Sequence, residues 1–288
     1  MQTPLTNSNK PILFTLTAFL LFVSTVFSQS KKTTNERKAF TKYFPDKALA
    51  ELVADRLHKN INDRVTPSEL ADIKGGFDVG PGEVTDLTGI GYLIGIDAFS
   101  CGKNEVTSIP PEIGRMKNLV WISLVKAFEL KTIPREIGNL KKLKYLNICL
   151  TQLVVIPKEI GNLENLDTLY LFSNNISIVP KELGNLKKLM LLDISSNNIE
   201  LLPGEICNMS ALQKLFVTHN KLKFLPENIG NLKNLQTLNV NNNDLHTLPK
   251  SIKYLDRLSY LNIDDNPKLN ESYKNYLPAL LLNRKKKQ

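Results

Sequence analysis

Cysteine and histidine are the residue types best suited to nucleophilic, redox or metal-binding chemistry, so their spacing limits what this 288-residue chain can do. The chain has three of each, and no two cysteines form the Cys-x-x-Cys pair typical of zinc or redox sites. It also lacks a Gly-x-Ser-x-Gly motif, a phosphate-binding loop and zinc-ligand spacing. The residues concerned are Cys101, Cys149, Cys207, His58, His219 and His246. We therefore predict that the protein is not an enzyme and has no catalytic residues, metal or cofactor.

Aromatic and aliphatic residues recur at regular intervals and suit partner binding better than catalysis. They concentrate between residues 121 and 216, and the equivalent positions farther along the chain are polar. Four steps of about 4.8 Å between neighbouring strands would spread them over roughly 19 Å, and an apolar patch of that size commonly marks an interface. The candidate partner-binding residues are Trp121, Tyr145, Tyr170, Phe172, Leu191 and Phe216. Self-association through these residues, or no binding role, are the alternatives.

A strict internal repeat must position these side chains. Prolines from Pro134 to Pro249 are spaced by 23 residues, and Pro110 precedes Pro134 by 24. The unit reads LxxLxLxxNxLxxLPxEIGNLxx and occurs about eight times. Its LxL segment predicts a short strand with buried apolar residues, and the residues on either side of them would face outward. Successive strands would stack in parallel, because one coil cannot bury its own apolar face.

Polar residues near the end of each strand have predicted roles in the turn. The asparagine at the ninth position can satisfy backbone groups in its own turn and in the neighbouring coil. Cys149 falls at an outward position, so a reactive thiol is one interpretation, whereas Cys101 and Cys207 take packing positions. Asp264 and Asp265 could chelate a cation or form the solvated end of a turn.

Both ends of such a stack need caps. Residues 46–59 place apolar side chains on one helical face, and Thr66 and Glu69 form a capping box that predicts a second helix, stopped by Gly75-Gly76. The predicted C-terminal cap uses Tyr273, Tyr276, Leu277 and Leu281. The expected domains are a helical N-terminal cap with the start of the first repeat at 44–92, a repeat domain at 93–269, and a C-terminal cap with a basic tail at 270–288.

The LPxEIGNLxxLxxL unit over residues 96–266 is identified as a leucine-rich repeat, and it resembles the repeats of Ras-suppressor and plant disease-resistance-like proteins. This resemblance implies an α/β fold, a curved horseshoe solenoid with a parallel β-sheet on its concave face and helical caps at both ends. The preceding segment, from Phe44-Pro45-Asp46 to VTDLTGIGYL at 84–93, is similar to the N-terminal cap and first repeat of secreted bacterial internalins. Listerial internalins mostly use 22-residue repeats without the Leu-Pro step, so their cell-entry activity is not carried over.

The N-terminal segment has the composition of a targeting signal. A polar start containing Lys10 precedes the apolar run Ile12–Phe27, and Val26 and Ser28 occupy the −3 and −1 positions of a possible cleavage site before Gln29. We predict a signal peptide at 1–28, cleaved between Ser28 and Gln29, and a linker at 29–43. A retained membrane anchor is the alternative, although a span needs about 20 residues. Cleavage implies a secreted, cell-surface or periplasmic protein.

The formal net charge of +9 reflects 37 Lys and Arg residues against 28 Asp and Glu residues, with a basic cluster at 284–287. Most other lysines recur within the repeats, so nucleic-acid binding is not expected. The sequence therefore predicts a secreted or surface-associated module that binds a protein partner on its concave face. Two alternatives remain: an intracellular scaffold of the Ras-suppressor type, and a membrane-tethered structural protein whose basic tail contacts anionic lipid.

Overall fold

A computed structural model of the chain describes residues 35–275. Two units are distinguished, Met1–Glu36 and Arg37–Gln288, and the following description concerns the second. The predicted signal peptide, its cleavage site and the expected cap residues Tyr276, Leu277 and Leu281 lie outside the described residues. Within residues 35–275, no helix is both long and apolar enough to cross a membrane.

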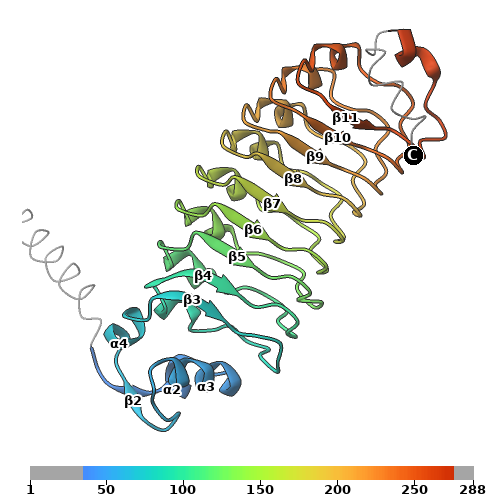
Figure 1. Cartoon of the computed structure of the whole chain (residues 1–288). Coiled ribbons are helices and arrows are strands. Elements are labelled where there is room, and N and C mark those ends of the chain that lie inside the picture. Colours follow the sequence, from blue (N-terminus) through green and yellow to red (C-terminus); the bar gives the residue numbers. More distant parts are fainter. Residues whose placement is uncertain (1–34, 276–288) are drawn as a thin grey trace, which may run out of the picture. The chain divides into compact units, whose positions relative to one another are not determined.

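Within the described residues, nine parallel strands form one sheet in which neighbours in sequence are neighbours in space (Figure 1). From β5 onward the strands pair in strict register, so that Leu146 lies beside Ile122 on one side and Leu169 on the other. In β5 to β8 the middle residue is buried and its two flanking residues are partly exposed, as the LxL pattern predicts. The strands are β3 (Gly75–Asp78), β4 (Ile96–Ser100), β5 (Trp121–Ser123), β6 (Tyr145–Asn147), β7 (Thr168–Tyr170), β8 (Leu191–Asp193), β9 (Lys214–Phe216), β10 (Thr237–Asn239) and β11 (Tyr260–Asn262).

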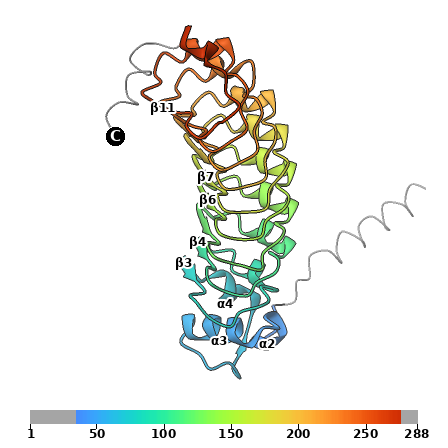
Figure 2. The ribbon, with the colours of Figure 1, turned by 90° about the vertical axis from the view of Figure 1, so that its right-hand side faces the viewer.

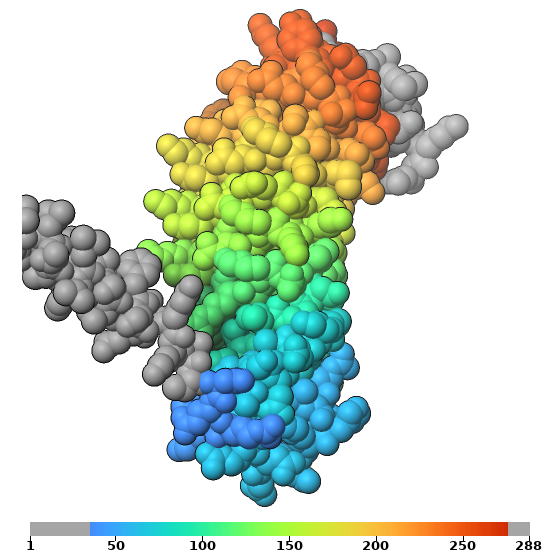
Figure 3. Space-filling model, turned by 90° about the vertical axis from the view of Figure 1, so that its left-hand side faces the viewer, coloured from blue at the N-terminus to red at the C-terminus, as the bar shows by residue number. Residues whose placement is uncertain are grey.

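The return segment of each coil is a short 3-10 helix, and these helices stack on the side opposite to the strands (Figure 2). In most coils the proline of the Leu-Pro step precedes the helix, with φ of −74° at Pro134 and −69° at Pro180, values that the proline ring imposes. The helices are η1 (Ile90–Tyr92), η2 (Pro111–Arg115), η3 (Arg135–Asn139), η4 (Lys158–Asn162), η5 (Lys181–Asn185), η6 (Gly204–Asn208), η7 (Ile229–Asn231), η8 (Lys250–Tyr254) and η9 (Glu271–Asn275). The space-filling view shows the coils in chain order, from the blue cap to the red last coil (Figure 3).

The glycine of the EIG triplet allows adjacent 3-10 helices to pack closely. A Cβ atom at Gly184 would lie 2.1 Å from the carbonyl oxygen of Glu205 in the next coil, a distance that no real contact allows. Cys207 takes the glycine position in η6, and there the following helix, η7, is shortened to Ile229–Asn231. The Cys207 side chain is buried.

A continuous apolar core runs through the coils and is bounded at the strand ends by a ladder of buried asparagines. The Oδ1 atom of Asn197 accepts from the backbone N–H of Ile176 in the preceding coil at 3.0 Å. Its Nδ2 atom donates to the carbonyls of Leu171, in the preceding coil, and Ile194, in its own turn, at 2.9 and 3.0 Å. Equivalent bonds are made by Asn174, Asn220, Asn243 and Asn266. The predicted role of these amides is confirmed.

This ladder is incomplete in the first coils. Asn104 donates to the carbonyls of Gly80 and Gly102 at 2.6 and 3.1 Å, but its buried Oδ1 atom has no hydrogen-bond partner among the described residues. The next coil has Ala127 at the asparagine position, within the 24-residue repeat, and the coil after it has Thr151. At Asn197 and its equivalents, a backbone N–H of the preceding coil donates to Oδ1, and Asn104 lacks this donor among the described residues.

The N-terminal cap closes the core at one end (Figure 1). A two-stranded antiparallel pair, β1 (Lys38–Ala39) with β2 (Arg64–Val65), accompanies helices α2 (Phe40–Tyr43), α3 (Lys47–Arg56) and α4 (Pro67–Ala71). The predicted capping box is present in α4: Thr66 Oγ1 accepts from the Glu69 N–H at 3.1 Å, and Glu69 Oε2 accepts from the Thr66 N–H at 2.8 Å. It stabilises the start of a helix of only five residues.

Two features of the cap differ from the sequence prediction. The segment predicted as a linker, 29–43, contains β1 and α2 at its C-terminal end, and Phe40 there is fully buried. Gly75 and Gly76 do not stop a helix but begin β3, the first strand of the long sheet. Neither glycine has a side chain that could contribute to an alternating pattern, so this strand has no signal of its own in the sequence. At the other end, η9 places Tyr273 in the core.

Candidate functional site

The outward side chains of β5 to β9 form the surface that carries most of the candidate residues, and we call this surface the strand face. Because the strands are in register, the side chains form rows across the sheet. One row contains Trp121, Tyr145 and Leu191, the next contains Tyr170 and Phe216, and Phe172 follows the end of β7. All six are partly exposed. The strand face comprises Trp121, Ser123, Tyr145, Asn147, Thr168, Tyr170, Leu191, Asp193, Lys214 and Phe216.

Three of these residues form a continuous aromatic ladder across β5, β6 and β7. The ring centroids of Trp121 and Tyr145 are 5.5 Å apart and the ring planes differ by 12°, so the two rings are stacked. Tyr145 and Tyr170 follow at 5.9 Å with an angle of 57° between their planes. Offset aromatic pairs at such distances add stability beyond the area that they bury. The ladder is therefore an ordered surface, although its side chains are partly exposed.

Asp193 lies in the same row as Tyr170 and Phe216, which flank it on β7 and β9. Its Oδ1 atom accepts from the backbone N–H of Ser195 at 3.0 Å. Burial raises the pKa of the Asp193 carboxyl above its ordinary value, and the hydrogen bonds from Ser195 oppose this effect only in part. Asp193 has no ion-pair partner among the described residues. The alternation in the LxL segment predicts that this residue faces outward, but burial of a single carboxylate leaves no pattern in a sequence that would assign it a role.

Cys149 is not exposed, which corrects the interpretation of this residue as a reactive thiol. Only 1% of its surface is accessible, and burial raises the pKa of its thiol to about 12. The chain turns inward immediately after β6, where the Cys149 N–H donates to Asn147 Oδ1 and Leu150 adopts a φ of 57°. Cys101 and Cys207 are buried as well, as predicted, and burial raises both thiol pKa values to about 12.

The C-terminal end of the sheet is polar, as predicted. Asp264 and Asp265 are exposed in the turn after β11, where the Asp264 N–H donates to Asn262 Oδ1 at 3.0 Å. Across residues 35–275, no group of three or more His, Cys, Asp or Glu side chains is arranged to hold a metal ion.

A second apolar surface, which sequence reasoning missed, lies outside the strand face. It is a row of residues two positions before the proline in four successive coils, and we call it the flank stripe. Ile178 is 75% exposed and Leu201 is 67% exposed, whereas the apolar residues of the strand face are only partly exposed. Val155 and Ile178 form an isolated parallel bridge, so the stripe follows the register of the coils. Its members are Val155, Ile178, Leu201 and Phe224. In the sequence, these residues occupy the second variable position of the LxxLP segment, and the apolar residue types at that position could have indicated the stripe.

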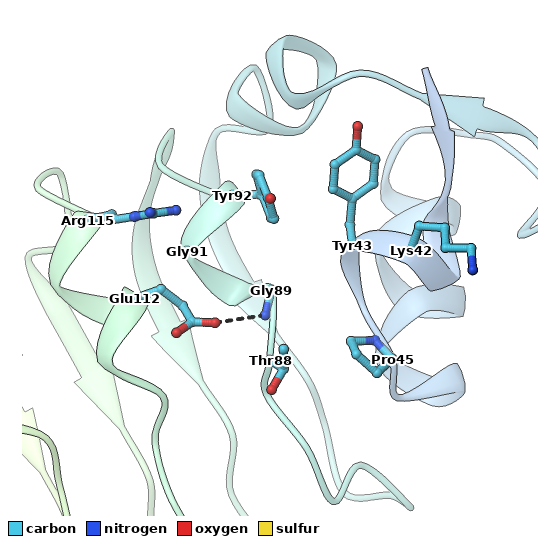
Figure 4. A pocket seen from close by; sticks show the side chains of 9 residues that line it. All are labelled: Lys42, Tyr43, Pro45, Thr88, Gly89, Gly91, Tyr92, Glu112 and Arg115. Atoms are coloured by element: carbon cyan, nitrogen blue, oxygen red, sulfur yellow. Dashed lines mark hydrogen bonds between the residues drawn. The ribbon is translucent and has the colours of Figure 1, made fainter. Parts of the chain in front are cut away.

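A cavity of about 320 Å³ lies between the cap and the first coils, and Figure 4 shows its lining. The Tyr43 and Tyr92 rings meet edge to face with centroids 4.9 Å apart, and Glu112 Oε1 accepts from the Gly89 N–H at 3.2 Å. Gly89 has a φ of 95°, and a Cβ atom there would lie 2.0 Å from the Tyr43 carbonyl oxygen. Only glycine permits this close approach, so these contacts join the cap to the array.

Comparison with known families agrees with this architecture. Residues 130–224 match the family described as leucine-rich repeat region, and residues 234–255 match the family described as leucine-rich repeat. The chain is a leucine-rich repeat protein. No curated protein sequence matches it.

Several solved structures are similar to this chain. A leucine-rich repeat protein of Leptospira interrogans is 32% identical, with a TM-score of 0.60 over 69% of this chain and 56% of that one. Internalin C2 of Listeria monocytogenes is 25% identical, with a TM-score of 0.67 over 80% of this chain and 99% of that one, so the fold is internalin-like. The ectodomain of the Arabidopsis thaliana receptor kinase GASSHO1/SCHENGEN3 is 28% identical, with a TM-score of 0.50 over 66% of this chain and 26% of that one. The chain thus spans about half the length of the Leptospira protein and a quarter of the plant ectodomain.

Proposed function

We propose that this protein is a non-enzymatic recognition module, secreted or surface-associated, that binds a protein partner on its strand face. The observation that carries the proposal is the aromatic ladder of Trp121, Tyr145 and Tyr170. Leu191 and Phe216 continue the apolar surface beyond it. Partly exposed aromatic side chains at the centre of a surface are the residues that most often dominate binding energies between proteins.

The rigidity of the array also supports this proposal. Each strand is held in register by its two neighbours, and buried asparagines bond each of the later turns to the coil before it. A partner that docks on such a surface loses little free energy to ordering of the backbone. A modest apolar patch is then sufficient for a specific complex.

Two similar structures support the proposed setting. The plant receptor kinase ectodomain was solved in complex with Casparian strip integrity factor 2, so in that protein a leucine-rich repeat domain holds a partner. Internalin C2 has the highest TM-score of the three, and the N-terminal cap of this chain resembles that of secreted bacterial internalins. The intracellular scaffold and the membrane-tethered protein remain the alternative proposals, and self-association on the strand face is a third.

The location is tested by fractionating cells that produce the full chain and measuring the mature N-terminus by mass spectrometry. A soluble exported form that begins near Gln29 is expected. An intact form that begins at Met1 in the cytosol would favour the scaffold, whereas intact protein in the membrane fraction would favour the tether.

The binding surface is tested with two matched double variants of the full chain. Tyr170→Ala with Phe216→Ala removes two aromatic rings from the strand face. Ile178→Ser with Leu201→Ser removes two apolar side chains from the flank stripe, and these are more exposed than the two rings. Proteins retained by the wild-type chain and by each variant are compared by quantitative mass spectrometry. A partner that is lost with the first variant and kept with the second is expected, with binding weakened by more than about 2 kcal/mol. The opposite pattern would move the site to the flank stripe.

A further inference from the structure

We propose that the strand face recognises an arginine side chain of its partner, which stacks on the aromatic ladder and pairs with the Asp193 carboxylate. This inference rests on the proposed function and specifies the chemistry of the partner. It is carried by three observations: the geometry of the ladder, the carboxylate beside it, which has no ion-pair partner among residues 35–275, and the distribution of positive charge over the described part of the molecule.

Tyr170, the last ring of the ladder, is the aromatic group beside Asp193 on which an incoming planar cation would stack. Trp121 and Tyr145 are stacked with their planes only 12° apart, and Tyr170 extends the ladder toward the next strand. Cations are attracted to the faces of tryptophan and tyrosine rings, and the flat guanidinium group of arginine also stacks on them. The ammonium group of lysine is a compact, strongly hydrated charge and gains less from such a surface.

Asp193 supplies the counter-charge at the end of this ladder. It is paired in register with Tyr170, so its carboxylate lies one strand beyond the last ring of the ladder. The side chain is partly buried, and its hydrogen bonds come from the side chain and the backbone of Ser195, whose N–H donates to Oδ1. Within residues 35–275 no cationic group lies within ion-pair distance of it. A partly buried carboxylate without a counter-ion is unfavourable, and a guanidinium offers it two parallel N–H donors.

Most basic side chains in the described part of the molecule lie away from this site, so they do not compete with a cation that binds there. The chain carries a formal net charge of +9, but Lys214 is the only basic residue of the strand face. Four lysines lie on the return side of the described coils with their ammonium groups bonded to backbone carbonyls of the next coil. Lys141 donates to the carbonyl of Asn162 at 2.7 Å, and Lys187 donates to that of Asn208 at 2.8 Å. An arginine that approaches the ladder therefore meets aromatic rings and a carboxylate.

Trp121 is the only tryptophan of the chain, and it is connected to the arginine site through its stacking on Tyr145 and the contact of Tyr145 with Tyr170. The full-length protein is titrated with the blocked peptide acetyl-Gly-Arg-Gly-amide at constant ionic strength, and the tryptophan fluorescence is followed. The same peptide with citrulline, which is neutral and nearly isosteric, is the matched control ligand. We expect a saturable change with the arginine peptide and an affinity at least tenfold weaker for the citrulline peptide. The lysine peptide should fall between the two.

Two variants locate the charge that is recognised. Asp193→Asn keeps the acceptor for the Ser195 N–H but removes the negative charge, so the arginine and citrulline peptides should then bind equally. Asp167→Asn makes the same change of charge at the residue that precedes β7, outside the strand face, and should leave the tenfold preference intact. A thermal melt of each variant confirms that it is folded.

Equal binding of the arginine and citrulline peptides by the wild-type chain would overturn this inference, as would an unchanged preference in Asp193→Asn. These failures are distinguishable from failure of the proposed function. If Tyr170→Ala with Phe216→Ala removes the protein partner while Asp193→Asn retains it with full affinity, the strand face is the binding surface and the arginine site is wrong.

Discussion

The asparagine ladder makes a quantitative prediction about stability, and Asn197 is the residue at which it is tested most clearly. Asn197→Ala removes four hydrogen bonds of this side chain: one accepted from the Ile176 N–H and three donated to carbonyls. The Ile176 N–H is buried and is left without a partner, which costs about 1 to 3 kcal/mol.

The carbonyls are affected less, because each of the two buried ones keeps a second donor. Leu171 still accepts from Asn174 at 3.0 Å, and Ile194 still accepts from Asn220 at 3.0 Å. Loss of one bond at each adds roughly 0.5 to 1 kcal/mol. The expected decrease in the free energy of unfolding is therefore about 3 kcal/mol.

The measurement is urea denaturation followed by circular dichroism, with Asn198→Ala as the control. Asn198 is the next residue in the same turn, and the hydrogen bond from its backbone N–H to the Ile176 carbonyl does not depend on its side chain. The control should lose less than about 0.5 kcal/mol. A difference of under 1 kcal/mol between the two variants would refute the conclusion that the ladder holds the coils together.

Three further predictions follow from the cap, the core and the flank stripe. Hydrogen bonds from Lys59 and from the backbone of Thr66 lower the pKa of Glu69 from 4.5 to about 2, so its contribution is complete above pH 4.5 and is lost as the pH falls toward 2. In acid titrations of stability, Glu69→Gln should lose about 1 kcal/mol at pH 7 and much less at pH 2, where about half of Glu69 is protonated in the folded protein; an equal loss at both pH values would contradict this. Burial raises the pKa of all three cysteine thiols from 9.0 to about 12. Because the thiolate is the reactive form, native protein at pH 8 should react with Ellman's reagent about 1000-fold more slowly than unfolded protein. A fast phase in the native state would disprove this. Ile178→Ser with Leu201→Ser should change the thermal midpoint little, because both side chains are mostly exposed, and a large decrease would show that the stripe is covered.

Much of the fold could be predicted from the sequence because each coil repeats the same physical problem. Leucines at fixed spacing define which side chains are buried, and the asparagine after each strand indicates where backbone groups would otherwise be unpaired. The capping box of α4 was also readable, because the two residues that form it are only three positions apart. The placement of six candidate residues on or beside one face followed from the alternation in each strand.

Other features depend on contacts between coils and leave no local signal. The residue before each asparagine position adopts a left-handed backbone conformation, with φ of 64° at Lys126, 57° at Leu150 and 55° at Ser173. None of these residues is glycine. The turn imposes this conformation, and residue types at the position vary freely. The burial of Cys149 follows from the same turn, and the partly buried state of Asp193 depends on residues one repeat away.

The asparagine ladder also gives the array a direction. Asn266 bonds backward to the Val240 carbonyl and the Leu245 N–H, and none of these side chains reaches forward to the next coil. Duplication or deletion of an internal unit that carries the asparagine would therefore preserve the bonds between neighbouring coils, so such genes can change length without redesign of the protein. The N-terminal joint is different, since Asn104 has an acceptor that no preceding unit fills. Variation in length between descendants of this sequence should accumulate among the internal units, while the joint with the cap is inherited intact.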